Sequence, residues 1–181
     1  MISKIKGLIK GGVGTGIVIF IILQVIFKNK SIISNISTAI SITTICIIIY
    51  CNYLWKYIPE SISKLPKLFG TWEGIIKSSY DGFDKEFKFK IIIKQTLLNI
   101  YIQLLSEESE SNSITCELIK DNKNDYILIY SYCNEPHQDV KDRSEIHYGT
   151  AKLNVINNKE LKGGYFTGRQ TIGVMELKKI S

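Results

Sequence analysis

The sequence predicts a transmembrane helical hairpin followed by an all-β domain, an eight-stranded antiparallel up-and-down barrel. Three observations predict this fold. Two long apolar segments fill the first third of the chain, the basic excess of the protein lies around them, and after Pro66 the apolar residues follow the two-residue period of strands. The expected domains are residues 1–58 for the hairpin, 59–67 for a linker and 68–181 for the barrel.

The two apolar segments are long enough to cross a membrane. Residues 11–27 contain 17 positions without a formal charge, and residues 31–55 contain 25. A helix rises about 1.5 Å per residue, so roughly 20 apolar residues span the hydrocarbon. The first segment reaches this length if it begins at Leu8 and Lys10 extends its ammonium to the interface. Only residues 28–30 separate the segments, which predicts a hairpin. A cleaved signal peptide is disfavoured, because no small-residue cleavage pattern follows the first segment.

The basic excess of the chain lies around these two segments. Residues 1–65 carry seven lysines and one acidic side chain, whereas residues 66–181 carry 16 basic and 16 acidic side chains. A domain that binds DNA or RNA would need its positive charge on the folded part, so no nucleic-acid polymer is expected as a partner. Lysines beside apolar spans interact with anionic headgroups, so membrane lipid is an expected partner.

The placement of the lysines also predicts the orientation of the hairpin. Positive side chains are enriched on the cytoplasmic flanks of membrane spans. Two lysines, Lys28 and Lys30, lie in the expected turn. Six lie outside it: Lys4, Lys6, Lys10, Lys56, Lys64 and Lys67. We therefore expect two spans with both termini in the cytoplasm, and an aromatic belt from Tyr50 to Tyr57 at the inner interface.

The four cysteines predict thiols rather than disulfides or zinc ligands. Cys46 and Cys51 lie in the second apolar segment, while Cys116 and Cys133 have neither a CxxC spacing nor paired histidines. A cytoplasmic domain also lies in a reducing compartment. We therefore expect reduced cysteines and no metal site.

Hydroxyl residues recur on one face of the second apolar segment. Their spacing of three and four residues places them on one side of a helix. They form a hydroxyl stripe of Ser34, Ser37, Ser41 and Thr44. Two explanations stay open. Each hydroxyl can bond to a backbone carbonyl four residues earlier, or the stripe can form a helix–helix interface in lipid, as the Gly12-x-x-x-Gly16 motif also suggests. The second explanation predicts self-association.

After Pro59 and Pro66 the sequence is typical of strands. The expected segments are rich in Ile, Tyr, Phe and Thr and alternate partly between apolar and polar residues. Within residues 87–93 the odd positions are apolar and face one way, while Lys88 and Lys90 face the other. The expected strands are Leu68–Tyr80, Asp84–Thr96, Leu98–Ser106, Ile114–Lys120, Tyr126–Cys133, Ile146–Ile156, Glu160–Phe166 and Thr171–Ile180.

Short polar segments separate these strands. Asp81-Gly82, residues 121–125 and Asn157-Asn158 are typical of hairpin turns. Residues 106–113 and 134–144 are expected to form longer polar loops. Eight sequential antiparallel strands close most simply into an up-and-down barrel, which removes sheet edges and can hold one small ligand. A β-sandwich is the main alternative.

Nothing in the sequence argues for catalysis. It contains no metal-ligand cluster, no GxSxG elbow and no glycine-rich phosphate loop that opens a helix. The two histidines, His137 and His147, are ten residues apart. We therefore expect no enzyme, no catalytic residues and no cofactor.

The last expected strand carries features of a ligand site. By alternation Met175 faces inward, and the same parity turns Thr171, Gly173 and, if the strand begins early enough, Arg169 inward. A glycine inside a strand allows close approach of a ligand, and an arginine among hydroxyls suits a phosphate-bearing ligand. Alternatively, Arg169 stacks on Trp72 and closes one end of the barrel. The candidate ligand-binding residues are Tyr148, Thr150, Tyr165, Thr167, Arg169 and Thr171.

The architecture and two motifs resemble a known family. Gly70-Thr71-Trp72 opens the strand-rich domain, and Tyr165-Phe166-Thr167-x-Arg169-x-Thr171-x-Gly173-x-Met175-x-Leu177 lies near the end. With the two spans, they resemble the two-transmembrane, β-strand-rich effectors of CBASS antiphage operons. Gln170 stands where we would expect a small residue.

The resemblance implies a ligand and an outcome. A minimal eight-stranded barrel would bind a cyclic dinucleotide made by a partner nucleotide cyclase. Binding would drive self-oligomerisation and disruption of the bacterial inner membrane, so that the infected cell dies before phage mature.

A ligand that binds the assembled state more tightly promotes assembly, and a short linker to a hydroxyl-striped hairpin fits such coupling. Two other functions stay open. A membrane-tethered carrier or sensor of a lipid or other apolar small molecule would need an apolar interior, and a structural module would have a filled core. Tyrosine, hydroxyl and Arg169 side chains in the interior favour the cyclic dinucleotide.

Overall fold

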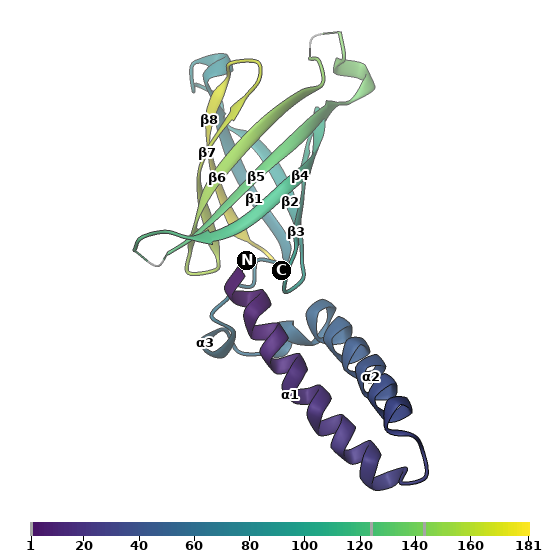
Figure 1. Ribbon diagram of the computed structural model, residues 1–181. Coiled ribbons are helices and arrows are strands. Elements are labelled where there is room, and N and C mark those ends of the chain that lie inside the picture. Colours follow the sequence, from purple (N-terminus) through teal and green to yellow (C-terminus); the bar gives the residue numbers. More distant parts are fainter. Residues whose placement is uncertain (1, 124, 143) are drawn as a thin grey trace. The chain divides into compact units, whose positions relative to one another are not determined.

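The computed structural model describes residues 2–123, 125–142 and 144–181. It contains apolar helices near the N-terminus and a closed barrel of eight strands (Figure 1). The chain divides into two compact units, which separate at residue 63, inside the expected linker. The first unit comprises residues 1–63 and 96–98, and the second comprises residues 64–95 and 99–181.

The first unit is a helical hairpin. α1 (Ile2–Ile26) and α2 (Ile32–Asn52) are both long and apolar enough to cross a bilayer. The Ser31 side chain caps α2 by accepting a hydrogen bond from the Ser34 backbone N–H. Two short helices follow, η1 (Leu54–Tyr57) and α3 (Glu60–Ser63). The expected pair of apolar helices is confirmed.

Small residues form the seam between α1 and α2. A Cβ atom added at Gly16 would lie 3.3 Å from Thr43 Oγ1, and one added at Gly12 would lie 2.8 Å from Ile47 Cδ1. Ala39 and Thr43 are buried on the facing side of α2. The motif of two glycines therefore serves the contact inside the hairpin, where the absent side chains let the helices approach closely.

The hydroxyl stripe of α2 lies away from this seam. Consecutive residues of a helix are about 100° apart, so Ser41 lies about half a turn around the axis from Thr43. All four stripe residues are exposed. Ser41 Oγ donates to the Ser37 carbonyl oxygen at 3.0 Å, and Thr44 Oγ1 donates to the Ile40 carbonyl oxygen at 2.9 Å. Backbone bonding therefore occurs for two of the four hydroxyls, and the stripe faces outward from the hairpin.

The second unit is a closed antiparallel barrel in which each strand pairs with the next and β8 pairs with β1. This confirms the up-and-down barrel and excludes the sandwich, because closure pairs both edge strands. The strands are β1 (Gly70–Ser78), β2 (Phe87–Gln95), β3 (Ile100–Ser106), β4 (Ser109–Lys120), β5 (Tyr126–Pro136), β6 (His147–Ile156), β7 (Glu160–Thr167) and β8 (Ile172–Lys179). Two short 3-10 helices lie in loops, η2 (Ser79–Asp81) and η3 (Gln138–Val140).

β4 is longer than predicted. It begins at Ser109 rather than at Ile114, so the long polar loop expected over residues 106–113 is wrong. A β-bulge lies between Ser113 and Thr115 and shifts the alternation by one residue. The inward residues before the bulge are serines, so this stretch lacks the apolar alternation that marks a half-buried strand.

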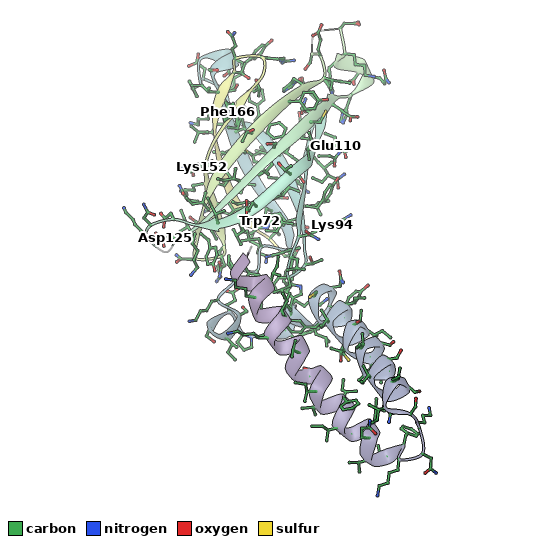
Figure 2. The ribbon with its side chains drawn as sticks, viewed as in Figure 1. Trp72, Lys94, Glu110, Asp125, Lys152 and Phe166 are labelled. Atoms are coloured by element: carbon green, nitrogen blue, oxygen red, sulfur yellow. The ribbon has the colours of Figure 1, made fainter. Side chains whose placement is uncertain are left out.

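The barrel has two ends, which we call the closed end and the mouth end and define by the turns that each contains. The closed end contains the entering segment and the last residues of the chain, together with the turns of residues 96–99, 121–125 and 157–159. The mouth end contains the loops of residues 79–86, 107–108, 137–146 and 168–171. Successive turns of an up-and-down barrel alternate between the two ends. Figure 2 shows Trp72 near the closed end and Phe166 near the mouth end.

Apolar side chains fill the closed end. Trp72 Nε1 donates to the Leu68 carbonyl oxygen at 2.8 Å. The Gln95 side chain accepts hydrogen bonds from the Leu68 and Phe69 N–H groups and donates to the Pro66 carbonyl, which ties the entering segment to β2. At most 2% of each of the following side chains is exposed: Trp72, Ile91, Ile93, Ile102, Leu128, Leu153, Leu161 and Leu177. Trp72 is therefore a structural floor.

The stacking of Arg169 on Trp72 is wrong. Lys179 lies opposite Trp72 in the β1–β8 register, and its Nζ is 5.8 Å from the centroid of the Trp72 ring. Arg169 lies in the β7–β8 turn at the mouth end instead. Because β8 begins only at Ile172, Arg169 precedes the strand and strand parity does not turn it inward.

Candidate functional site

Inward-facing residues change from apolar to polar toward the mouth end. On β7, Leu161 is fully buried at the closed end, whereas Thr167 is the buried inward residue at the mouth end. On β5, the inward residue near the closed end is Leu128, and four residues later, nearer the mouth end, the inward residue is Tyr132. We name the polar group at this end the mouth cluster: Ser78, Ser111, Tyr132, Asn134, Tyr165, Thr167 and Thr171.

Two hydrogen-bonded pairs hold three of the hydroxyl groups of the mouth cluster. Ser111 Oγ donates to Asn134 Oδ1 at 2.7 Å, and both residues are more than 90% buried. Thr167 Oγ1 and Thr171 Oγ1 lie 2.6 Å apart, so one donates to the other. Each hydroxyl oxygen still has acceptor capacity, because a hydroxyl has one donor and two lone pairs. The cluster can therefore hydrogen-bond to a polar ligand.

Two inward glycines make room for two tyrosine rings. A Cβ atom added at Gly149 on β6 would lie 2.4 Å from the Tyr132 hydroxyl oxygen. One added at Gly173 on β8 would lie 2.3 Å from Tyr165 Cε1. Such distances are shorter than any real carbon contact, so these rings lie directly against the bare backbone. The close approach that the sequence predicted at Gly173 is therefore made by Tyr165.

Burial raises the pKa of the inner tyrosines. Burial raises the pKa of the Tyr132 phenol, and the neighbouring Tyr165 raises it further. Burial also raises the pKa of Tyr130, with smaller contributions from Tyr132 and Cys116. Cys116 itself has its pKa raised by burial to about 12. All of these groups are protonated at neutral pH, so they can donate hydrogen bonds but offer no charge.

Three of the predicted site residues come together at the mouth end. Tyr165 and Thr167 face inward from β7, and the Thr171 hydroxyl meets that of Thr167. Arg169 is exposed in the turn between β7 and β8. Its Nη1 donates to Ser144 Oγ at 3.1 Å and to the Glu145 carbonyl oxygen at 3.4 Å, which ties this turn to the loop of residues 137–146.

The other two predicted site residues face the outside of the barrel. Tyr148 is 64% exposed. Thr150 lies opposite Ser131 and Phe166 in the registers of its two neighbours, and its Oγ1 is 3.3 Å from Ser131 Oγ. Because the adjacent Gly149 faces inward against Tyr132, strand alternation places both residues on the outer wall.

Sequence reasoning missed Tyr132, Asn134 and Ser111. A weak signal existed for the first, because Tyr130-x-Tyr132 places two tyrosines on one face of an expected strand. Asn134 and Ser111 lay in stretches that were interpreted as loops, so no parity could be assigned to them. Within the described residues, no group of three or more His, Cys, Asp or Glu side chains is placed to hold a metal ion.

The barrel and the whole chain are similar to known proteins. Residues 63–179 match the family model described as Cap15, cyclic dinucleotide receptor domain. A CD-NTase-associated protein 15 from Staphylococcus schleiferi is 34% identical over 185 residues, which cover 99% of this chain and 100% of the relative. The protein of the same name from Escherichia albertii is 29% identical over 184 residues, which cover 94% of each chain.

Proposed function

The chain belongs to the Cap15 family of cyclic dinucleotide receptor domains, and from this premise we propose that its barrel binds a cyclic dinucleotide at the mouth cluster. The membership confirms the resemblance to CBASS antiphage effectors that the two sequence motifs indicated. The protein is therefore an antiphage effector that contains a receptor domain. The contacting residues, the orientation of the hairpin and the outcome at the membrane are parts of our proposal.

The mouth cluster is the observation that carries the proposal. A cyclic dinucleotide offers two flat bases, two ribose units and two phosphodiesters. The rings of Tyr132 and Tyr165 suit the bases, because bases stack on aromatic side chains. The hydroxyls of Thr167 and Thr171 suit base edges or phosphate oxygens.

Arg169 would supply the charge that phosphates require. Its guanidinium lies at the mouth end and is exposed, so it can approach a bound phosphodiester without the cost of burying a charge. The proposed site therefore consists of Tyr132, Tyr165, Thr167, Arg169 and Thr171. Tyr148 and Thr150 stand outside it, because they face the outer wall.

Ligand binding would act on the membrane through the helices. We propose two spans with both termini in the cytoplasm, where a partner cyclase would supply the ligand. The exposed hydroxyl stripe on α2 supports self-association of hairpins, because small hydroxyl residues allow close packing of helices in lipid. A ligand that prefers the assembled state would drive oligomers and disrupt the bacterial inner membrane.

The competing function, carriage or sensing of an apolar molecule, receives less support. Such a protein needs an apolar interior that is open to its cargo. Here the apolar end is filled by Trp72, Ile91 and Leu128, each at most 1% exposed, while the other end carries the mouth cluster. The interior that faces a ligand is therefore the polar one.

Calorimetric titration of the full chain in detergent with a panel of cyclic dinucleotides tests the proposal. We expect saturable binding to at least one of them. Tyr165→Leu should weaken it by about 1–3 kcal/mol, because one stacking partner is lost. Phe166→Leu is the matched control, since Phe166 is the next residue on β7 and is 59% exposed on the outer wall. Absence of binding by a folded chain, or equal losses in both variants, would contradict the proposed site.

A further inference from the structure

The two ends of the barrel carry opposite charge. To compare their charge, we count the charged side chains in the segments assigned to each end and in the last two residues of every strand at that end. By sequence, the closed end then carries eight lysines and three acidic side chains, whereas the mouth end carries six basic side chains, Arg143 among them, and ten acidic ones. The net charge of this domain is balanced, but its two ends therefore differ by nine charges.

Most of the lysines at the closed end are exposed. Only Lys67 and Lys179 of the eight are partly buried. Lys179 Nζ donates to the Lys67 carbonyl oxygen at 3.0 Å and lies over the Phe69 ring, so it belongs to the packing. The exposed set, which we name the lysine collar, is Lys64, Lys94, Lys120, Lys123, Lys159 and Lys178. Figure 2 shows Lys94 near this end and Glu110 nearer the mouth.

The opposite end presents carboxylates. They lie in three of its four loops and on the adjacent strand ends, so a negatively charged surface would repel this end. The ten are Asp81, Asp84, Glu86, Glu107, Glu108, Glu110, Glu135, Asp139, Asp142 and Glu145. A charge distribution of this kind orients a domain in an external field.

The connection to α2 limits how far the closed end can lie from the hairpin. The barrel is entered at its closed end, and only residues 53–63 separate it from α2. Fully extended, these residues reach at most about 40 Å. Tyr57 and Ile62 in this connection are 75% and 71% exposed, beside Lys56 and Lys64, which is a composition typical of a membrane interface.

We propose that the lysine collar binds anionic phospholipid headgroups, so that the barrel stands on the membrane with its acidic mouth directed away from it. The attraction acts within about a Debye length of the surface, near 10 Å at 0.1 M salt, and the connection of residues 53–63 allows the collar to come that close. This orientation turns the mouth end toward the surrounding solution. The inference rests on the proposed insertion of the hairpin into the membrane.

Amide hydrogen exchange of the full chain in lipid nanodiscs tests this inference. We compare discs of phosphatidylcholine alone with discs that contain about 30% phosphatidylglycerol, which gives a negative surface. In the anionic discs the turns of residues 121–125 and 157–159 should exchange more slowly by about threefold or more. The loops of residues 79–86 and 137–146 should be unchanged. About 0.5 M KCl should remove the difference, since it shortens the Debye length.

Two variants of equal charge loss make the test specific. Replacing Lys64, Lys123 and Lys159 by Gln should abolish the slowing. Replacing Lys85, Lys88 and Lys141 by Gln, which removes three charges at the mouth end, should leave it intact. The inference is overturned if the turns are protected equally in neutral discs, if salt has no effect, or if both variants behave alike. A chain that enters no discs at all would instead contradict the membrane insertion on which the inference rests.

Discussion

Thr167 and Thr171 face each other across the turn between β7 and β8, with their hydroxyl oxygens 2.6 Å apart. The same turn is closed by backbone hydrogen bonds between Thr167 N–H and the Thr171 carbonyl and between Gln170 N–H and the Thr167 carbonyl. The hydroxyl pair is therefore fixed at the mouth end without help from a ligand. Such preorganisation lowers the entropic cost of binding.

Thr171→Val should weaken cyclic dinucleotide binding by about 0.5–1.5 kcal/mol, because it removes one hydroxyl and keeps the shape of the side chain. Thr150→Val is the matched control, since its hydroxyl lies on the outer wall opposite Ser131. Calorimetric titration measures both affinities. A larger loss for Thr150→Val than for Thr171→Val would place the ligand on the outer face of β6.

Arg169→Ala should weaken binding by about 1.5–3 kcal/mol if its guanidinium makes a charge-assisted contact to phosphate. The loss should shrink as salt is raised, because salt screens an exposed contact. The structure offers a second role, since Arg169 bonds to Ser144 and the Glu145 carbonyl. Faster exchange of the loop of residues 137–146, with unaltered affinity, would show that Arg169 only braces that loop.

Gly173→Ala should destabilise the barrel by about 1–3 kcal/mol, because a Cβ atom there would overlap the Tyr165 ring and overpacking costs this much. Gly168→Ala is the control, since the nearest atom to its Cβ would be the Tyr148 carbonyl oxygen at an ordinary 3.7 Å. Urea denaturation of the two variants measures the difference. Equal stabilities would mean that the Tyr165 ring moves at little cost.

The stability of the barrel should fall as the pH rises above about 9. Cys116 has a folded pKa of about 12 against an ordinary value of 9.0, because it is buried. Between these values the unfolded chain loses the proton and the folded chain keeps it, so unfolding is favoured by about 1.4 kcal/mol per pH unit for this group. Cys116→Ala should reduce the slope of unfolding free energy against pH in that window. An unchanged slope would assign the pH dependence to the tyrosines whose pKa burial also raises, Tyr126, Tyr130 and Tyr132.

Local patterns predicted the strands that have one apolar and one polar face. The inward positions of β2, among them Phe89, Ile91 and Ile93, are buried as the alternation indicated, and so are Met175 and Leu177 on β8. β4 could not be predicted in the same way, because its inner face is polar before the bulge and the bulge then reverses the parity.

Other features of the site depend on the register between strands, which local sequence patterns do not give. That Gly149 lies under the Tyr132 ring follows from the β5–β6 pairing, in which the two residues are opposite each other. The difference in charge between the two barrel ends likewise depends on the topology of the barrel. The turns of Asp121–Asp125 and Asn157–Lys159 are distant in sequence but lie at the same end, because alternate turns of an up-and-down barrel share an end.

The hydroxyl stripe of α2 should be where hairpins meet. Replacing Ser34, Ser37, Ser41 and Thr44 together by Leu keeps the helix apolar and leaves the seam at Ala39 and Thr43 untouched. The hydroxyls of Ser41 and Thr44 already bond to their own backbone, so the loss should come mainly from the close approach of small side chains and, for each interhelical hydrogen bond lost, about 0.5–1 kcal/mol.

Across an oligomer this loss should block ligand-induced crosslinking in membranes and cell killing with the cognate cyclase, while the affinity for the ligand stays unaltered. The control replaces four exposed residues of α1 by Leu: Ile17, Val18, Ile21 and Ile22. This control should crosslink and kill normally, since these side chains are already large and apolar. Full killing by the stripe variant would show that the stripe serves only the helix that carries it, and assembly would then have to depend on contacts between barrels.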